Sequence, residues 1–371
     1  MNDMHGILFA YSAGSRLQQL VEHRTTSSLP FAGRYRLIDF MLSNMVNSGI
    51  PDIGVIMHEN YQSLLDHLGS GKDWDLSRKH GGLKLLPPFA YTGNGRQGGY
   101  RGKLEALSGV YSYLEKIRQE YVVLANGDMA VNLPLEKVLK AHLDHCADIT
   151  AVCTRRTRGT PAESTYFSLL PDGRITDTAC GHYQEGSFES LDVYILSKSL
   201  LLNLVDYCSG HNQYSFEQDV MQRMRESLLL YGYEWDGYAA RFQCIADYYT
   251  KSMELLDPRI RQELFCRDRN IRTRDYSNPS TYYGPDSSCQ NSLISDGCLI
   301  EGRAENSILF RSVVIEPGAT VTNCVLMQGT RVQSGAVMKY VIADKRVTVH
   351  SGRVLIGHET YPLAISKGSV I

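Results

Sequence analysis

A short repeat in the C-terminal quarter of the chain is the feature that most restricts its fold. Four segments of similar pattern start 15, 17 and 16 residues apart, at Asn291, Asn306, Asn323 and Lys339. Aliphatic residues recur every six positions in this register, as at Val341 and Val347, and Gly-containing turns separate the segments. Short strands six residues apart, three to a coil, are typical of a parallel β-helix of the hexapeptide type. The repeat therefore predicts stacked coils with inward aliphatic side chains and Gly or Asn at the corners that need positive φ.

The first 255 residues follow a different pattern, in which apolar runs alternate with amphipathic stretches. Buried strands are expected at four apolar runs: Gly6–Ala10, Ile53–His58, Tyr121–Ala125 and Ile149–Thr154. Helical spacing follows the second and third of these runs, which predicts an α/β domain with a mixed, mostly parallel sheet. Ligands gather at the carboxyl ends of parallel strands, so the loops after Ala10 and Ala125 are candidate sites. We expect an α/β domain over 1–255, a linker over 256–282 and a β-helix over 283–371.

Composition excludes several classes of protein. The 371 residues contain 38 Lys and Arg against 40 Asp and Glu, which excludes a generally basic nucleic-acid coat. No apolar run approaches the roughly 18 residues of a membrane span, and the first residues do not resemble a signal peptide. Nine cysteines without a C-x-x-C pair indicate reduced thiols. These features predict a cytoplasmic protein that binds neither nucleic acid nor membrane.

The loop Tyr11–Leu17, after the first expected strand, is the first candidate site. It contains Gly14 and ends with Arg16-Leu17. A loop between a strand and a helix can bring backbone N–H groups close to phosphate, which requires glycine. This signal is weak alone and becomes specific together with residues 29–44, LPFAGRYRLIDFMLSN.

These segments resemble the bacterial glucose-1-phosphate adenylyltransferases, also called ADP-glucose pyrophosphorylases. Residues 29–44 resemble a characteristic block of that family, Tyr100-Arg101-Gly102 its nucleotide loop, and Asn126-Gly127-Asp128 its metal-binding turn. The repeat from Tyr283 on resembles its C-terminal domain. The resemblance covers nearly the whole chain. It implies a Rossmann-like nucleotidyltransferase domain followed by a left-handed parallel β-helix.

Several family positions that serve the phosphates carry other residues in this chain. Two glycines of the phosphate loop are Tyr11 and Ser12, so side chains occupy space that phosphate would use. The family's polyphosphate lysine falls on Thr26, and a threonine of the nucleotide loop falls on Lys103. The lysine that grips the sugar phosphate is absent from residues 178–182, where Gly181 stands near its place.

The metal site differs as well. Transfer of a nucleotidyl group depends on a Mg²⁺ ion held by two carboxylates. The resemblance leaves Asp128 as the one remaining carboxylate, because the second falls on Arg241. A guanidinium at that place reverses a charge beside the metal position. The sequence therefore predicts that the positions Thr26, Asp128, Gly181 and Arg241 are degenerate and that catalysis is lost. Asp128 is interpreted as a doubtful metal ligand, as a turn residue, or as an ion-pair partner of Arg241.

The resemblance to GlgD-type noncatalytic subunits implies a role for such a chain. It would assemble with a catalytic glucose-1-phosphate adenylyltransferase subunit into a heterotetramer and modulate ADP-glucose synthesis for glycogen. No cofactor is expected in this chain, and Mg²⁺ would belong to the partner. Two alternatives stay open: a weakly active nucleotidyltransferase, and a hexapeptide-repeat acyltransferase that would need His350 or His358.

Two sets of residues remain as binding candidates. The vestigial nucleotide site would comprise the loop residues that match the family: Tyr11, Gly14, Arg16, Tyr100 and Gly102. Arg34 falls where the family has an effector-binding lysine, and Arg36 follows two residues later, so both are candidates for an anionic effector. A dense arginine cluster over residues 259–274 is interpreted as a solvated face paired with acidic residues.

Overall fold

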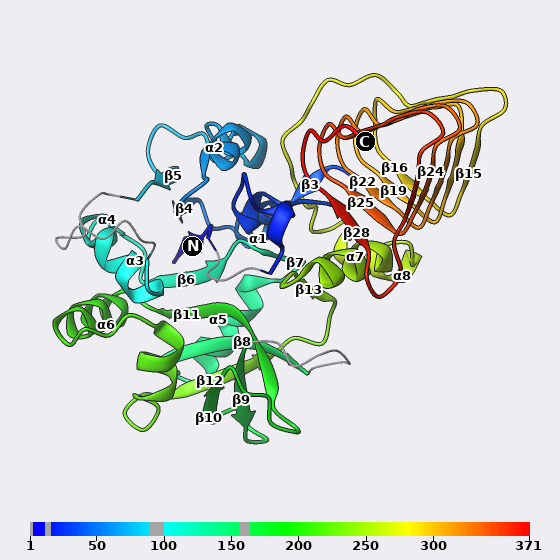
Figure 1. Ribbon diagram of the computed structural model, residues 1–371. Helices are drawn as coiled ribbons and strands as arrows, with labels where there is room; N and C mark the ends of the chain where they lie inside the picture. Colours follow the sequence, from blue (N-terminus) through cyan, green and yellow to red (C-terminus); the bar gives the residue numbers. More distant parts are fainter. Residues whose placement is uncertain (1–2, 12–15, 89–99, 156–163) are drawn as a thin grey trace.

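The computed structural model describes residues 3–11, 16–88, 100–155 and 164–371. Figure 1 shows an α/β domain beside a C-terminal β-helix, with α7 (Ile245–Glu254) and α8 (Pro258–Leu264) next to the β-helix. The segment expected as a linker therefore contains a helix. Asp257 caps α8 by accepting the backbone N–H of Arg259, and Pro258 occupies the first helical position, where its missing N–H is not needed.

The α/β domain is built on a nine-stranded mixed sheet. Its central strands are parallel, in the order β6 (Tyr121–Asn126), β1 (Met4–Phe9), β4 (Asp52–Ile56) and β5 (Gly82–Leu86). Next to β6 lies β11 (Phe188–Ser197), which runs antiparallel to both β6 and β8. The remaining strands extend the sheet beyond β11: β8 (Ile149–Arg155), β9 (Thr165–Leu169), β10 (Ile175–Cys180) and β12 (Leu230–Glu234). The four expected strands are confirmed as β1, β4, β6 and β8.

Helices cover both faces of this sheet, each with its own apolar core. One face is covered by α3 (Lys103–Gly109), α4 (Tyr111–Leu114) and α6 (Lys198–Gly210). The other is covered by α1 (Leu37–Asn47), α2 (Gln62–Leu68) and α5 (Leu135–Asp144). Three single-turn 3-10 helices occupy residues 18–20, 26–28 and 72–74, and a seven-residue π-helix occupies residues 216–222. Two small ladders pair β2 (Pro30–Phe31) with β3 (Tyr35–Arg36) and β7 (Met129–Val131) with β13 (Ala239–Arg241). No helix in these described ranges is long and apolar enough to span a membrane.

The C-terminal repeat forms a left-handed parallel β-helix of three five-stranded sheets. The first sheet contains β14 (Tyr282–Tyr283), β17 (Leu299–Ile300), β20 (Val314–Ile315), β23 (Arg331–Val332) and β26 (Thr348–Val349). The second contains β15 (Ser288–Gln290), β18 (Arg303–Glu305), β21 (Thr320–Thr322), β24 (Val337–Lys339) and β27 (Val354–Ile356). The third contains β16 (Leu293–Ile294), β19 (Ile308–Leu309), β22 (Val325–Leu326), β25 (Val341–Ala343) and β28 (Leu363–Ile365).

The corners of the coils confirm the prediction that Gly or Asn stands where the backbone needs positive φ. Positive φ occurs at the first residue of three repeat segments, Asn291, Asn306 and Asn323, and at Tyr340, the second residue of the fourth segment. Asparagine tolerates the left-handed region better than most residues, so its recurrence at three of these corners follows from backbone geometry. The inward aliphatic side chains form a continuous core along the coils.

A second apolar cluster joins the β-helix to the α/β domain. Phe31 and Phe40 of the α/β domain share it with Phe310 and Ile342 of the β-helix. The hydroxyl of Tyr249 in α7 donates to the backbone carbonyl of Asn323, 2.9 Å away. The two parts are therefore packed against each other through buried side chains, and sites at their boundary are held by both.

Candidate functional site

The ladder of β7 and β13 sets the relation between Asp128 and Arg241. Asp128 follows β6 and immediately precedes β7, while Arg241 lies opposite Met129 in the antiparallel register of β13. Burial alone would lower the pKa of Arg241, but neighbouring carboxylates raise it, with Asp192 first, Glu189 second and Asp128 third. Asp128 therefore lies close enough to Arg241 for its charge to raise the pKa of the guanidinium. The main partner of its guanidinium is Asp192, a residue that the sequence comparison did not single out.

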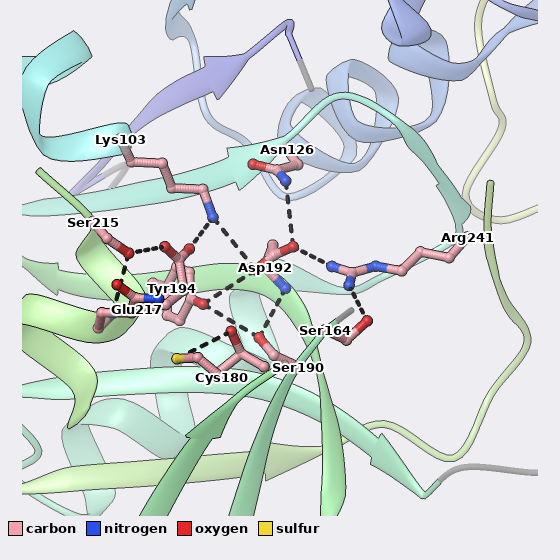
Figure 2. Close-up of polar contacts among 12 residues, drawn as sticks. Lys103, Asn126, Ser164, Cys180, Ser190, Asp192, Tyr194, Ser215, Glu217 and Arg241 are labelled. Carbon is pink, nitrogen blue, oxygen red and sulfur yellow. Dashed lines mark hydrogen bonds and ion pairs between the residues drawn. The ribbon is translucent and has the colours of Figure 1, made fainter. Parts of the chain in front are cut away.

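Arg241 is held by three side chains from the sheet. Its Nη2 forms a short ion pair with Oδ2 of Asp192. Its Nη1 donates to Oγ of Ser164 at 3.0 Å and lies 3.9 Å from Oε1 of Glu189. Figure 2 shows the guanidinium extending from β13 toward Asp192 and Ser164. The position that carries a carboxylate in the family therefore carries a cation with its partners in place.

Asp192 owes its position to an irregularity of β11. The pairing of β11 with β8 shifts register between Ser190 and Val193, and Asp192 has φ of 50°. A bulge re-aims side chains that regular alternation would bury or expose. The backbone N–H of Asp192 donates to Oγ of Ser190 at 3.1 Å, which stabilises the bend. A carboxylate is thereby placed at the centre of the site.

Both carboxylate oxygens of Asp192 are occupied. Oδ2 accepts from Arg241 and from Nδ2 of Asn126 at 3.3 Å, and Oδ1 accepts from the Tyr194 hydroxyl at 3.3 Å and lies 3.4 Å from Nζ of Lys103. Burial would raise the pKa of Asp192, but the charges of Arg241 and Lys103 lower it to about 2. Asp192 is therefore ionised and shared between two cations at neutral pH.

Lys103 is the second cation of the cluster. It begins α3 and points inward, where its Nζ pairs with Glu217 in addition to Asp192. The ring of Tyr194 lies 5.3 Å and the ring of Phe9 5.9 Å from Nζ, which adds cation–π attraction. Burial would lower the pKa of Lys103, yet the carboxylates of Asp192 and Glu217 raise it. We refer to Lys103, Glu189, Asp192, Glu217 and Arg241 as the closed site; Figure 2 labels all of these except Glu189.

The closed site does not fit a divalent cation. The oxygens of its central carboxylate already accept from or pair with four groups. A metal at Asp128 would also lie beside the Arg241 guanidinium, which repels it. Among the described residues, no group of three or more His, Cys, Asp or Glu side chains is arranged to hold a metal. The carboxylates of the closed site are therefore committed to Lys103 and Arg241.

Aromatic side chains fill the neighbouring region of the vestigial nucleotide site. The Tyr11 ring lies 5.5 Å from that of Tyr100 and 5.9 Å from that of His58, and the last two rings are 5.5 Å apart. Burial raises the pKa of the Tyr11 hydroxyl, which has no hydrogen-bond partner in the described part of the chain. A cavity of about 220 Å³ lies beside this cluster, lined in part by Tyr11 and Thr26. The side chain that replaced a glycine therefore packs within the pocket.

The other residues expected at this site are described by their backbone contacts and packing. Gly14 lies outside the described residues. The backbone of Arg16 forms an isolated parallel β-bridge with that of Cys244, and its N–H donates to the backbone carbonyl of Gln243. An added Cβ on Gly102 would lie 2.2 Å from the carbonyl oxygen of Tyr214, so close backbone packing requires this glycine. Gly181 has φ of 79° in a turn with open space around it.

A cleft between the two domains brings the expected effector residues together. Arg34 and Arg36 line it from the α/β domain, and Arg311 and Lys345 line it from the β-helix. We refer to this as the interdomain cleft. The described residues that line it include no carboxylate. Arg36 donates from Nη1 to the carbonyl of Ser63 at 2.5 Å and to its Oγ at 3.0 Å, which fixes the guanidinium at the cleft wall.

Lys345 is the residue of this cleft that the sequence did not reveal. Burial, together with the positive charges of Arg36 and Arg24, lowers its pKa to about 7, although the adjacent Asp344 acts in the opposite direction. Asp344 is engaged elsewhere, in a buried ion pair with Arg24. Residues about 300 positions apart create this environment. The one sequence signal was the pair Asp344-Lys345 in a turn of an otherwise aliphatic repeat.

Arginines of the cluster over residues 259–274 form ion pairs and hydrogen bonds within the protein. Arg259 pairs with the capping residue Asp257, and Arg269 pairs with Glu136 at 2.8 Å. Arg261 donates to the carbonyl of Leu255, and Arg274 donates to the carbonyl of Asp66. Arg259 and Arg269 therefore pair with acidic residues as expected, whereas Arg261 and Arg274 bind backbone carbonyls instead.

Two family models match the chain and agree with the two domains. Residues 5–177 match the nucleotidyl transferase model, and residues 281–361 match the GlmU-like C-terminal hexapeptide model. The chain is 35% identical over 370 residues to the glycogen biosynthesis protein GlgD of Bacillus subtilis, covering 100% of this chain and 97% of that protein.

Two proteins of Geobacillus stearothermophilus are also similar. Its glycogen biosynthesis protein GlgD is 38% identical over 322 residues, with 86% of this chain and 83% of that protein covered. Its glucose-1-phosphate adenylyltransferase is 30% identical over 321 residues, with 85% and 82% covered. The chain thus belongs to the family formed by the GlgD glycogen biosynthesis proteins and the glucose-1-phosphate adenylyltransferases.

Proposed function

We propose that this chain is a noncatalytic, regulatory subunit of glucose-1-phosphate adenylyltransferase in glycogen biosynthesis. The observation that carries the proposal is the bracketing of Asp192 by Arg241 and Lys103. Nucleotidyl transfer to a sugar phosphate depends on a cation that neutralises developing negative charge. Here the chain's own cations already neutralise the carboxylates of the site. The chain needs no resident metal, and Mg²⁺ acts in the catalytic subunit.

A noncatalytic chain of this kind would act by assembling with a catalytic subunit. The similarity extends over both domains of relatives named GlgD and glucose-1-phosphate adenylyltransferase, which supports assembly with a chain of the same two-domain architecture. We propose that it forms a cytoplasmic heterotetramer with that catalytic subunit and modulates its rate of ADP-glucose formation. The competing proposal is a weakly active nucleotidyltransferase.

The interdomain cleft supports binding of an anionic effector. Arg34, Arg36, Arg311 and Lys345 face it without a lining carboxylate, and two of them come from each domain. A phosphate or carboxylate group that bridges these cations would connect the domains by charge-assisted hydrogen bonds. Effector binding would thereby change how the β-helix and the α/β domain are held together.

Co-expression with the catalytic subunit tests the proposal. We expect a hetero-complex by mass determination and a rate of pyrophosphate release from ATP and glucose 1-phosphate that differs from that of the catalytic subunit alone. This chain alone should give no turnover with Mg²⁺.

The control pairs this chain with a catalytically inactive variant of the partner. Such a complex should be inactive, because this chain supplies no catalytic site. Turnover in it would overturn the noncatalytic assignment in favour of the weak enzyme. Absence of a complex, together with an unchanged rate, would overturn the regulatory role.

A further inference from the structure

Lys345 places a primary amine in the interdomain cleft without a counter-ion. It lies two residues after β25, and its backbone is held on both sides. Its N–H donates to Oδ1 of Asp344 at 2.6 Å, and its carbonyl accepts from the N–H of Gly368 at 2.9 Å. Among the residues that the structure describes, no hydrogen bond or ion pair reaches its Nζ. The backbone therefore fixes the residue at the cleft and leaves the amine available to a ligand.

The charges around this amine are mostly positive. The one carboxylate that acts on it, Asp344, is engaged in a buried ion pair with Arg24. Burial lowers the pKa of His67, so that ring carries little charge at neutral pH. Five basic side chains act on Lys345 or line the same cleft: Arg24, Arg34, Arg36, Arg311 and Lys367. These surroundings disfavour a cation on the Lys345 nitrogen and favour an anion in its place.

The same surroundings make the amine a nucleophile at neutral pH. The pKa of Lys345 is lowered to about 7, chiefly by burial. About three quarters of the side chain is therefore unprotonated at pH 7.5, against about 0.1% for a lysine with the ordinary pKa of about 10.4. A desolvated lysine amine next to other cations adds to electrophilic carbon, whereas an ammonium group has no lone pair with which to do so.

The size and charge of the cleft select the electrophile. Its cavity of about 30 Å³ has room for roughly two water-sized groups. Carbon dioxide has three atoms and no charge, so it fits this space and is not repelled by protonated side chains. Its adduct with an amine is an anionic carbamate. Arg34 and Arg36 line the same cleft, and guanidinium groups stabilise a carboxylate-like anion by charge-assisted hydrogen bonds.

We propose that the interdomain cleft is a carbon dioxide site, at which Nζ of Lys345 forms a reversible carbamate. The nitrogen lone pair forms an N–C bond to CO₂, one C–O π pair moves onto oxygen, and the nitrogen releases a proton to solvent. An uncharged amine and an uncharged CO₂ thus give a carbamate anion and a proton, without oxidation or reduction. The carbamate fills the place of an added anion, so CO₂ competes with anion binding at this cleft.

Chemical trapping on the purified chain tests the site. The chain is equilibrated at pH 7.5 with isotope-labelled CO₂ and bicarbonate and then treated with an oxonium alkylating reagent, which converts a carbamate into a stable ester. Peptide mass spectrometry should find at least about tenfold more label on Lys345 than on any other lysine side chain. The α-amino group of the chain has an ordinary pKa of about 8 and serves as the positive control for trapping.

Trapping requires neither an effector nor the catalytic subunit, so its result is independent of the proposed regulatory role. Arg34 is exposed, and Arg34→Gln should reduce the label on Lys345 and leave that on the α-amino group unchanged. The matched control is Arg303→Gln, at an exposed position of the β-helix outside the lining of the cleft, which should leave both labels unchanged. Label on the α-amino group without label on Lys345 would overturn the proposal.

A competition experiment separates the covalent carbamate from bicarbonate bound as a simple anion. Raising CO₂ at constant pH and ionic strength should weaken sulfate binding to the wild-type chain severalfold. Lys345→Arg keeps the positive charge and removes the nucleophilic amine, so its sulfate affinity should not respond to CO₂. Equal weakening in both proteins would show that bicarbonate competes without a covalent bond, and the carbamate would be rejected.

Discussion

Two clusters of basic side chains lie in this molecule, and they differ in the carboxylates that accompany them. In the closed site, Lys103 and Arg241 meet Asp192, Glu217 and Glu189, so the negative charges match or exceed the positive ones. In the interdomain cleft, four cations face one another across the domain boundary without a lining carboxylate. Electrostatic free energy therefore favours no added ion at the first cluster and an added anion at the second.

The comparison also shows that one fold can hold both a charge-matched cluster and a cluster in which cations predominate. The pKa of Asp192 falls to about 2, as expected for a satisfied ion pair. The pKa of Lys345 falls to about 7, as expected for a buried cation among other cations. At the interdomain cleft Arg311 pairs with Asp296 at 3.3 Å from behind the lining, whereas Lys345 lies among other cations.

Removing the central carboxylate should have the largest effect. Asp192→Asn leaves Arg241 and Lys103 buried with weaker partners, and breaking a buried ion pair costs about 3 kcal/mol or more. We expect the free energy of unfolding, measured by urea denaturation at pH 7, to fall by about that amount.

The control for this variant is an exposed pair. Glu234→Gln removes the partner of Arg155, whose side chain is 75% exposed, and should cost less than about 1 kcal/mol. Because the pKa of Asp192 is about 2 folded and about 3.9 unfolded, its contribution is present above pH ~4 and is lost toward pH 2. The difference between wild type and variant should shrink over that window. Equal losses in the two variants would contradict a self-satisfied site.

The next largest effect tests how tightly the wall of the closed site is packed. Gly102→Ala places a Cβ against the Tyr214 carbonyl, and overpacking of this kind costs about 1–3 kcal/mol. Thermal unfolding should show the loss. Gly210→Ala in α6 is the matched control, since an added Cβ there meets nothing within 4 Å. If both variants unfold at the same temperature, Gly102 is not required by packing.

The smallest expected effect concerns the pH dependence of anion binding at the interdomain cleft. An anion favours protonated Lys345, so binding takes up a proton above pH 7, and affinity should fall up to about tenfold per pH unit there. Burial lowers the pKa of His67, so this neighbour adds no titration above pH 7. Isothermal titration with sulfate, which keeps its charge between pH 6 and 9, measures the slope.

Two variants separate Lys345 from a general charge effect. Lys345→Arg keeps the cation at all of these pH values and should flatten the slope, while Lys116→Met, at an exposed site outside the cleft, should leave it unchanged. A pH-independent affinity in the wild-type chain would show that Lys345 does not contact the anion.

The parts of the fold and of the candidate site that depend on local or periodic sequence patterns could be predicted from the sequence. The β-helix follows from a six-residue repeat. The family resemblance led us to expect Asp128 near Arg241, and the β7–β13 ladder places Arg241 opposite Met129, the residue after Asp128. Asp192 could not be predicted in the same way, because its orientation depends on a bulge that alternation does not encode. Its one signal was a carboxylate inside the apolar run Leu191–Leu196.

The surroundings of Lys345 could not be predicted from the sequence either. Its pKa depends on Arg24 and Arg36, which are distant in sequence and reach it only because the β-helix packs against the first strands and turns of the α/β domain. Residue type alone made Arg34 and Arg36 candidates. The packing of the two domains made Lys345 part of the same surface.

The bulge at Asp192 has a consequence for how this chain responds to its surroundings. A ligand that sought the carboxylate would first have to separate it from Arg241 and Lys103, and that step alone opposes binding by several kcal/mol. The closed site is therefore a rigid part of the α/β domain, whose arrangement changes only when a ligand or partner supplies the free energy to separate these ion pairs.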